Sequence, residues 1–176
     1  MHFEKSVLKM KKTEIAFRKA TEKDIKAVYD LICDMEAKQL DFDSFAIIFR
    51  KQLSNDDYYC LLCTEEYTEK GGAEGCDVIG ELNLRFEDQL HHTGRIAEIM
   101  EFCIAAGKRN AGIGKMMLLE AYTIAKASGC IQIEVACNQL RKDTHRFYER
   151  EGMKNYHFKF SLPLTEENAN ENKLGR

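Results

Sequence analysis

A glycine-containing turn is the first stretch whose residue types and spacing could do chemistry. Residues 96–105 form an apolar run of β-forming residues, and the spacing R-x-x-G-x-G follows at Arg109, Gly112 and Gly114 before a helical pattern opens at Lys115. A strand, a turn and a helix in this order aim several backbone N–H groups at one point, beside the positive end of the helix dipole. The glycines let the backbone approach an anion with no Cβ in the way. The turn therefore predicts a phosphate-binding site; an ordinary strand-to-helix turn is the alternative.

Two well-known phosphate-binding loops do not fit this turn. A P-loop has a glycine where this chain has Arg109, and a Ser or Thr where it has Met116. The dinucleotide fingerprint has a third glycine where this chain has Met117. The turn belongs to neither class.

Two glutamates lie in the apolar run before the turn. Glu98 and Glu101 would each be costly there without a partner, because an unpaired charge is unfavourable among apolar groups. By strand periodicity they face opposite sides of a sheet unless a bulge intervenes. Either carboxylate could take a proton from a bound amine, and a structural ion pair is the alternative for each.

The turn resembles the pyrophosphate-binding loop of the GNAT superfamily of N-acetyltransferases, and the resemblance continues along the chain. Residues 145–153 are similar to the superfamily pattern A-x-x-F-Y-x-x-x-G-F, with Thr144 in place of the alanine and Met153 in place of the final aromatic residue. A closer resemblance is to the aminoalkylphosphonate N-acetyltransferases. It rests on residues 27–33, 91–92, 96–114, 145–148 and 156–160, and the whole similarity covers about residues 14–164.

The resemblance implies that acetyl-CoA is the cosubstrate. The strands expected at 96–105 and 130–137 would splay apart at a bulge, and the pantetheine arm would enter the gap and pair with one of them like an added strand. A backbone N–H near Phe102 or Cys103 would meet the oxyanion. The residues expected to bind acetyl-CoA are Phe102, Cys103, Ile104, Arg109, Asn110, Ala111, Gly112, Ile113, Gly114, Lys115, Asn138 and Tyr148.

The resemblance also implies roles in acetyl transfer. Glu98 lies eleven residues before the arginine of the turn, where several superfamily members have the glutamate that acts as base, and Glu101 is the second choice. Tyr148 matches the tyrosine that protonates the departing thiolate, with core packing as its alternative. Asn138 is placed to bind pantetheine, with an ordinary turn as its alternative.

Histidines and arginines elsewhere have more general interpretations. Adjacent His91 and His92 point apart on an extended chain, so a polar loop is the alternative to a metal site there. The resemblance leaves a divalent metal open, but no metal ligand is predicted from the sequence. Arg50, Arg85 and Arg95 could receive an anionic tail of the acceptor, because Arg binds phosphonate oxygens in pairs, or they could be solvated surface charges.

Hydrophobic periodicity predicts the elements that position these residues. Residues 14–18 alternate as a strand, residues 25–35 repeat at helical spacing, and residues 43–44 are expected to cap a second helix. Strands are expected at 58–64 and 78–86. The resemblance implies that the helical stretch after the first strand forms one wall of an amine pocket, with core packing as the alternative for its phenylalanines.

The connections complete the expected fold. A glycine- and glutamate-rich mobile loop is expected at 65–77 and a second loop at 87–94. A helix that ends at Gly129 joins the two strands of a right-handed βαβ unit, which are therefore parallel. The fold expected is α/β (α+β) of the GNAT type: a mixed, mostly antiparallel central sheet with a splayed parallel strand pair, flanked by helices.

Length, charge and cysteine content limit the remaining classes. With 176 residues and a net charge of −3, the chain suits one domain and shows no electrostatic footprint for nucleic acid or anionic membrane. No apolar run could span a bilayer, and seven mostly apolar-flanked cysteines favour reduced thiols in the cytoplasm. Cys60 and Cys63 have zinc-like spacing without a second pair, which favours core packing. We expect an N-terminal extension at 1–13, one domain at 14–164 and a polar tail at 165–176, and the sequence leaves a homodimer open.

The function expected is acetyl-CoA-dependent N-acetylation of a small primary amine by direct transfer in a ternary complex. An aminoalkylphosphonate-like acceptor is the first choice. A protein N-terminus, a lysine or a polyamine is the alternative within the enzyme class. From a different class, the alternative is a CoA-binding sensor that has kept the fold and lost turnover.

Overall fold

The computed structural model describes residues 13–68 and 74–164. The chain divides into two compact units, Met1–Val135 and Ala136–Arg176, and each is described by itself. The described part of the first unit holds the sheet and helices α1 to α3, and the second holds α4 (Lys142–Arg150). The tail at 165–176 and all but Thr13 of the expected extension lie outside the described residues, so the domain limits stay a prediction.

The sheet has five strands in the order β1-β2-β3-β4-β5. Neighbours among the first four are antiparallel, and β5 runs parallel to β4. The strands are β1 (Thr13–Lys19), β2 (Tyr58–Thr68), β3 (Glu74–Gln89), β4 (Gly94–Ile104) and β5 (Gln132–Val135). The chain passes from β4 to β5 through α3 (Ile113–Ala127), which is the expected crossover. The predicted fold class is confirmed.

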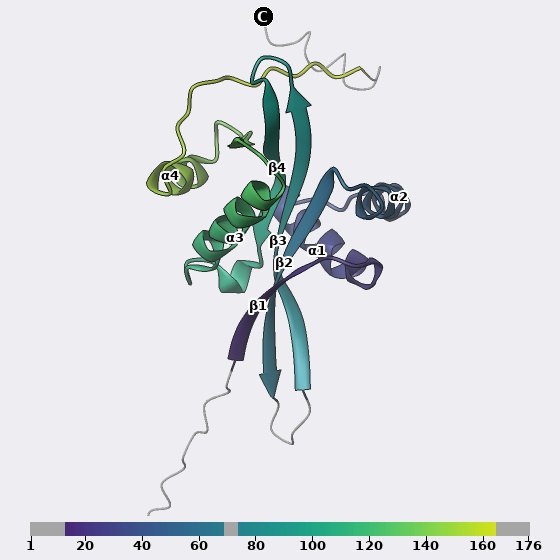
Figure 1. Ribbon diagram of the computed structural model, residues 1–176. Coiled ribbons are helices and arrows are strands. Elements are labelled where there is room, and N and C mark those ends of the chain that lie inside the picture. Colours follow the sequence, from purple (N-terminus) through teal and green to yellow (C-terminus); the bar gives the residue numbers. More distant parts are fainter. Residues whose placement is uncertain (1–12, 69–73, 165–176) are drawn as a thin grey trace, which may run out of the picture. The chain divides into compact units, whose positions relative to one another are not determined.

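Helices cover both faces of the sheet (Figure 1). On one side lie α1 (Ile25–Glu36) and α2 (Phe42–Leu53), whose Val28 and Phe49 pack in one core cluster with Cys60 of β2. On the other side lies α3: a Cβ added at Gly80 of β3 would come within 2.7 Å of Met117 Sδ. The sheet therefore has no fully solvated face, and this cover is the reason that some polar residues of the strands are buried.

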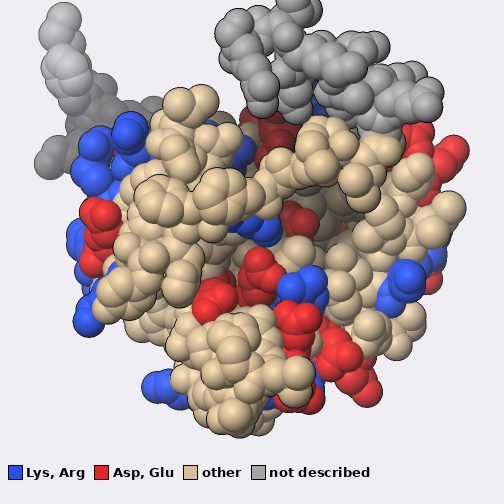
Figure 2. All heavy atoms as spheres, turned by 90° about the horizontal axis from the view of Figure 1, so that it is seen from above, with Lys and Arg blue, Asp and Glu red and all other residues tan. Residues whose placement is uncertain are grey.

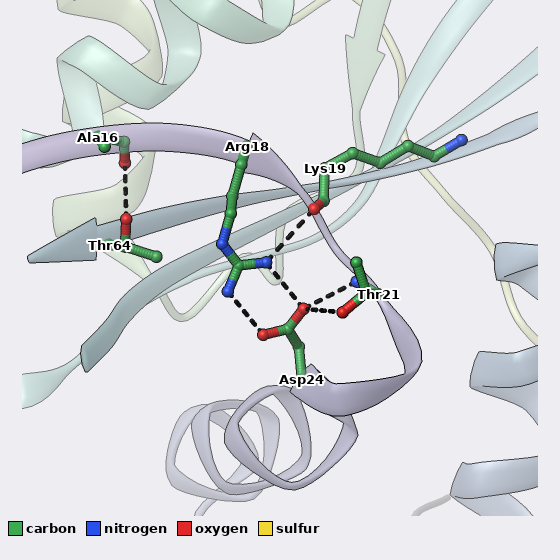
Figure 3. Close-up of polar contacts among 6 residues, drawn as sticks. All are labelled: Ala16, Arg18, Lys19, Thr21, Asp24 and Thr64. Carbon is green, nitrogen blue, oxygen red and sulfur yellow. Dashed lines mark hydrogen bonds and ion pairs between the residues drawn. The ribbon is translucent and has the colours of Figure 1, made fainter. Parts of the chain in front are cut away.

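The junction between β1 and α1 is held by one buried carboxylate (Figure 3). Asp24, which is 7% exposed, accepts two hydrogen bonds from the Arg18 guanidinium at 2.8 and 2.7 Å. It also accepts from the backbone N–H and the hydroxyl of Thr21, at 2.8 and 2.9 Å. These bonds, first among them that from Arg18, lower the pKa of Asp24 to about 2.

The prediction of a mobile loop at 65–77 is wrong for most of these residues. β2 continues to Thr68 and β3 begins at Glu74, and residues 69–73, with two of the three glycines that suggested a loop, lie outside the described residues. The third, Gly75, pairs with Tyr67, and an added Cβ would come within 2.4 Å of the tyrosine ring. The glycine is therefore a strand residue covered by a cross-strand aromatic ring rather than a loop residue.

Three other boundaries also differ from those expected. The second loop shrinks because β3 continues to Gln89 and β4 begins at Gly94. The N-cap of α2 is Asp41, whose side chain accepts from the Ser44 N–H at 2.9 Å, so the cap lies two residues before the predicted one. The strand expected at 130–137 is reduced to β5, which pairs with β4 only from Ile96 to Ile99.

Candidate active site

The glycine turn has the backbone shape that anion binding requires. Between β4 and α3 the chain forms a short 3-10 turn at Ala106–Lys108, and then Asn110 and Gly112 take positive φ angles of 63° and 81°. Gly112 is the N-cap of α3, so the first backbone N–H groups of this helix have no partner within it. A Cβ added at Gly112 would meet no atom within 4 Å, so the side of this N-cap residue is open. The residues present thus fit a phosphate group.

The basic residues of the turn bind acidic residues of neighbouring elements. Arg109 Nε donates to the Ile104 carbonyl oxygen at 2.9 Å, and another guanidinium nitrogen donates to Asp34 of α1 at 2.8 Å. Lys108 Nζ donates to Glu65 of β2 at 2.5 Å. Arg109 and Asp34 are both about half exposed, so their ion pair contributes little stability and can exchange for another anion.

The parallel strand pair separates where the sequence predicted a gap. β4 pairs with β5 only from Ile96 to Ile99, whereas β4 itself continues to Ile104. The register against β3 shifts at the same point, since Leu84 faces Ile99 while Asn83 faces Glu101, which leaves Met100 as the extra residue of a bulge. β5 therefore does not pair with the segment that includes Phe102, Cys103 and Ile104.

The bulge places Glu98 and Glu101 on the same face of the sheet. Their partners in β3, Arg85 and Asn83, are two residues apart and so point the same way. Glu98 accepts a hydrogen bond from Arg85 at 2.7 Å, which is the ion pair considered as its alternative role. Glu101 accepts from Asn83 Nδ2 at 3.0 Å, and burial raises its pKa more than this bond lowers it.

A third carboxyl group on this face, Glu81 of β3, was missed in the sequence. It is 1% exposed, and burial raises its pKa to about 8, assisted by the nearby charge of Glu101. The thiols of Cys60 and Cys103 donate to its two oxygens at 3.7 and 3.5 Å. Burial in turn raises the pKa of both thiols, so they remain protonated.

The alternation of polar and apolar residues in β3 assigns Glu81 to a solvent-exposed face. Glu81, Asn83 and Arg85 alternate with Leu82 and Leu84, which is the pattern of a strand with one face in water. α1 and α2 cover that polar face. Helices were expected on both sides of the sheet. That expectation could have indicated that Glu81 is buried, because a strand face covered by helices is not in water.

A cavity of about 180 Å³ lies between this face of the sheet and the two helices. Its walls are apolar side chains of α1 and α2, including Ile32 and Phe45. Glu81, Asn83 and Glu101 form its polar floor. The cavity therefore reaches from β3 to the part of β4 that β5 no longer covers.

Tyr148 and Asn138 both lie in the second unit. Tyr148 is the buried residue of α4, at 8% exposure. The Asn138 side chain accepts from the Leu140 N–H at 2.9 Å, and its carbonyl oxygen accepts from the Arg141 N–H at 3.0 Å. Asn138 thus forms the turn considered as its alternative, and its part in CoA binding stays a prediction.

The remaining charged candidates have carboxylate partners. Arg50 binds Glu22 at 2.6 Å and Arg95 binds Asp57 at 2.7 Å. The rings of His91 and its neighbour His92 lie 4.2 Å apart, and His92 Nε2 lies 3.5 Å from Glu134. Within residues 13–68 and 74–164, no group of three His, Cys, Asp or Glu side chains could hold a metal ion.

Surface charge and helix length bear on the nucleic-acid and membrane classes that the sequence did not favour. Figure 2 shows acidic and basic side chains next to one another, rather than a surface of one sign. In the part of the chain that the structure describes, no helix has the length and apolar character needed to cross a membrane.

Comparisons with known proteins agree with this geometry. Residues 25–153 match the model of the acetyltransferase (GNAT) family. A protein of Salmonella typhimurium described as aminoalkylphosphonate N-acetyltransferase is 33% identical over 147 residues, which is 84% of this chain and 90% of that protein.

Solved structures show the same fold. A transcriptional regulator from Bacillus halodurans superposes with a TM-score of 0.74 at 21% identity, over 86% of this chain and 100% of that chain. An aminoglycoside N-acetyltransferase in complex with CoA superposes with a TM-score of 0.73 at 9% identity, over 88% of this chain and 97% of that chain.

Proposed function

Because the chain belongs to the GNAT family of acetyltransferases, we propose that it transfers the acetyl group of acetyl-CoA to a small primary amine by direct transfer in a ternary complex. Family membership makes the chain an acetyl-CoA-dependent N-acetyltransferase. The acceptor class and the direct route are our proposal. The observation that carries them is the position of Glu101, which follows the last β4–β5 pair and lines the cavity.

The proposed reaction needs a neutral amine, because alkylamines are mostly protonated at neutral pH. Glu98 or Glu101 takes the ammonium proton, directly or through one water. The amine nitrogen then attacks the thioester carbonyl carbon, and a backbone N–H near Phe102 or Cys103 stabilises the oxyanion. Collapse of this intermediate breaks the C–S bond, and Tyr148 protonates the departing thiolate. The nitrogen, which still carries one proton too many for an amide, releases it to water, and the tyrosinate regains a proton from water.

The cysteines support direct transfer over an acetyl-cysteine intermediate. Cys60 and Cys103 are the thiols of the candidate site, and burial keeps both protonated. A protonated thiol is a poor nucleophile. The amine therefore attacks acetyl-CoA itself.

Acetyl-CoA is expected to bind by two segments of the first unit. Its pyrophosphate fits the turn formed by Arg109, Asn110, Ala111, Gly112, Ile113, Gly114 and Lys115. Its pantetheine arm fits the edge of β4 at Phe102 to Ile104, which β5 leaves open. The described histidines and carboxylates do not form a metal site, and no step of the proposed reaction passes through a metal.

An aminoalkylphosphonate is the leading acceptor because the relative from Salmonella typhimurium is described by that activity. Arg50, Arg85 and Arg95 are weaker candidates for its anionic end than the sequence suggested, because each already binds a carboxylate. A polyamine or a peptide amine remains the alternative acceptor. A CoA-binding sensor is the alternative from another class.

Thiol release from acetyl-CoA over a panel of amines tests the proposal. The panel contains aminoalkylphosphonates, alkylamines, diamines and lysine- or N-terminal peptides, and the expected result is turnover on the small amines. Turnover confined to peptides or polyamines would reassign the acceptor. Tight CoA binding by calorimetry with no turnover on any amine would replace the enzyme with the sensor.

A further inference from the structure

Arg109, the arginine of the glycine turn, is held by two other parts of the chain. Its Nε donates to the Ile104 carbonyl oxygen at 2.9 Å, and its Nη2 donates to Asp34 Oδ2 of α1 at 2.8 Å. A guanidinium group binds a phosphate most strongly through two parallel N–H groups. The Asp34 carboxylate therefore occupies a donor that an incoming phosphate also needs.

The two contacts of Arg109 differ in how easily a ligand can replace them. Ile104 is five residues away in the chain, at the end of β4, so its carbonyl group stays beside the turn. Asp34 is 75 residues away, and its side chain is 53% exposed, against 49% for Arg109. Exposed ion pairs of this kind contribute little stability. The bond to Ile104 can thus keep the guanidinium at the turn while a phosphate oxygen replaces the Asp34 carboxylate.

The position of Asp34 in α1 is unfavourable for the helix alone. Asp34 lies in the last turn, which contains no basic residue, and its carbonyl oxygen accepts from the N–H of the C-cap residue Ala37. The carbonyl end of a helix carries partial negative charge, so it repels a carboxylate. Arg109 offsets this repulsion in the free chain and links the end of α1 to the turn.

The second basic residue of the turn forms a more enclosed ion pair. Lys108 Nζ donates to Glu65 Oε2 at 2.5 Å, and the Glu65 side chain is only 16% exposed. Leaving such a carboxylate without its partner is costly, because water reaches it poorly. Lys108 is therefore expected to stay with Glu65, and Arg109 is the better candidate to change its partner.

We propose that Asp34 competes with the pyrophosphate of acetyl-CoA for Arg109, and so limits the affinity of the turn for the cosubstrate and for the product CoA. This inference rests on the proposed function, which places the pyrophosphate at this turn. In the free chain, the ion pair neutralises Arg109 beside the adjacent charge of Lys108. When CoA binds, a phosphate replaces the carboxylate, and separating the ion pair offsets part of the binding free energy. Asp34 acts through Arg109, so it is a positioning residue.

Calorimetric titration of the full chain with CoA tests the competition. Asp34→Asn removes the charge and keeps the shape, so it should bind CoA about two- to fivefold more tightly than the wild type does. Asp30→Asn is the matched control, because Asp30 lies one turn earlier on α1, is similarly exposed and pairs with Lys26 instead; its CoA affinity should be unchanged. The melting temperature of Asp34→Asn should stay nearly constant, since losing the ion pair also relieves the repulsion at the helix end. A lower melting temperature with unchanged CoA affinity would make Asp34 merely structural.

A double-mutant cycle with Arg109→Gln assigns the effect to the ion pair. Arg109→Gln alone should weaken CoA binding, and adding Asp34→Asn to it should then have no further effect. An equal gain in Asp30→Asn, or the same gain without Arg109, would overturn the competition. Weaker CoA binding in Gly112→Ala together with no gain in Asp34→Asn would overturn the competition alone and leave the proposed pyrophosphate site standing. Wild-type CoA affinity in both Gly112→Ala and Arg109→Gln would overturn that site, and the competition with it.

Discussion

Three glutamates share one face of β3 and β4, and their surroundings differ. Glu98 forms an ion pair with Arg85. Glu101 is bound by Asn83 and has a raised pKa, and Glu81 is enclosed with a pKa of about 8. A base for an alkylammonium group must be ionised and close to the amine. Glu101 lines the cavity, where burial raises its pKa, whereas Glu98 shares its charge with an arginine.

Comparing Glu98→Gln with Glu101→Gln decides which carboxylate is the base. The variant that removes the base should lower kcat by roughly 10²–10⁴ with little change in acetyl-CoA affinity, because Gln keeps the shape and cannot take a proton. The loss should shrink at high pH, where more of the amine arrives neutral. Steady-state kinetics from pH 6 to pH 10 measures both effects.

A structural Glu98 has a different signature. Glu98→Gln would leave Arg85 with only its longer contact to Glu87, so thermal stability should fall while the rate changes little and shows no rescue at high pH. Normal turnover of both variants at neutral pH would exclude a carboxylate base on β4 and point to His91, His92 or a chain of waters.

Tyr148→Phe tests the proposed acid. The phenylalanine ring keeps the packing of a residue that is 8% exposed and removes only the hydroxyl group. Turnover should fall by roughly tenfold to a thousandfold, with the melting temperature nearly unchanged. Full activity at every pH would pass the role to water or to another residue.

At the scale of elements, the effect of the proposed phosphate-binding turn on acetyl-CoA binding can be distinguished from its effect on the stability of α3. Gly112 and Gly129 lie at the two ends of α3, both with positive φ (81° and 76°), and an added Cβ meets no atom within 4 Å at either. Alanine at each position should therefore cost similar stability, about 1 kcal/mol, from backbone strain alone. Gly112→Ala should in addition weaken acetyl-CoA binding at least tenfold, as measured by calorimetry. Equal CoA affinity in the two variants would exclude this turn as the pyrophosphate site.

The junction between β1 and α1 should set the acid limit of stability. The pKa of Asp24 in this junction is about 2, below its usual value. Asp24 therefore stabilises the fold when it is ionised, and this contribution is lost as pH falls from about 4 through about 2. Because Arg18 is 40% exposed, we expect only about 1–2 kcal/mol. Urea unfolding of Asp24→Asn should show lower stability at pH 7 and convergence with the wild type near pH 2. Asp30→Asn, which removes an exposed ion pair with Lys26, should show little effect at either pH.

The presence of the helices and strands could be predicted because it depends on local sequence patterns. The residues at which they begin and end could not, because these depend on contacts with other parts of the chain. The helical repeat of α1 and the alternation of β1 are properties of a few consecutive residues. The extent of β3 is not, since Gly75 reads as a loop residue until the ring of Tyr67 is placed over it. In the site, the turn at Gly112 is likewise local, whereas the common face of Glu98 and Glu101 depends on the register between β4 and β3.

At the scale of the whole sheet, cover on both faces explains the buried carboxyl group of Glu81. Helices α1 and α2 exclude water from a strand face that alternation alone assigns to solvent. Protonation is the response of a carboxyl group to such burial. The stability of the first unit should therefore depend on pH in a range where most proteins change little.

Glu81→Gln tests this dependence. A folded-state pKa of about 8, above the usual value, means that Glu81 favours the fold at low pH, and that this contribution is lost as pH rises from about 4.5 through 8. Wild-type stability should fall by up to roughly 1 kcal/mol per pH unit in this window, and that of Glu81→Gln should be flatter. Denaturant unfolding at pH 5, 6.5 and 8 measures the difference. Parallel pH profiles for the two proteins would mean that Glu81 is ionised in the folded state.

The bulge at Met100 means that β4 carries one residue more than its place in the sheet requires. Ile99 before the bulge and Phe102 after it lie opposite Leu84 and Leu82, which share a face, so shortening the strand by that one residue would exchange no side chains between the two faces. A shortened strand would run straight, and β5 could follow it to the end. The sheet needs only the shorter strand, and the single extra residue lies where β5 stops pairing with β4, so one insertion or deletion could decide whether this edge of β4 is open.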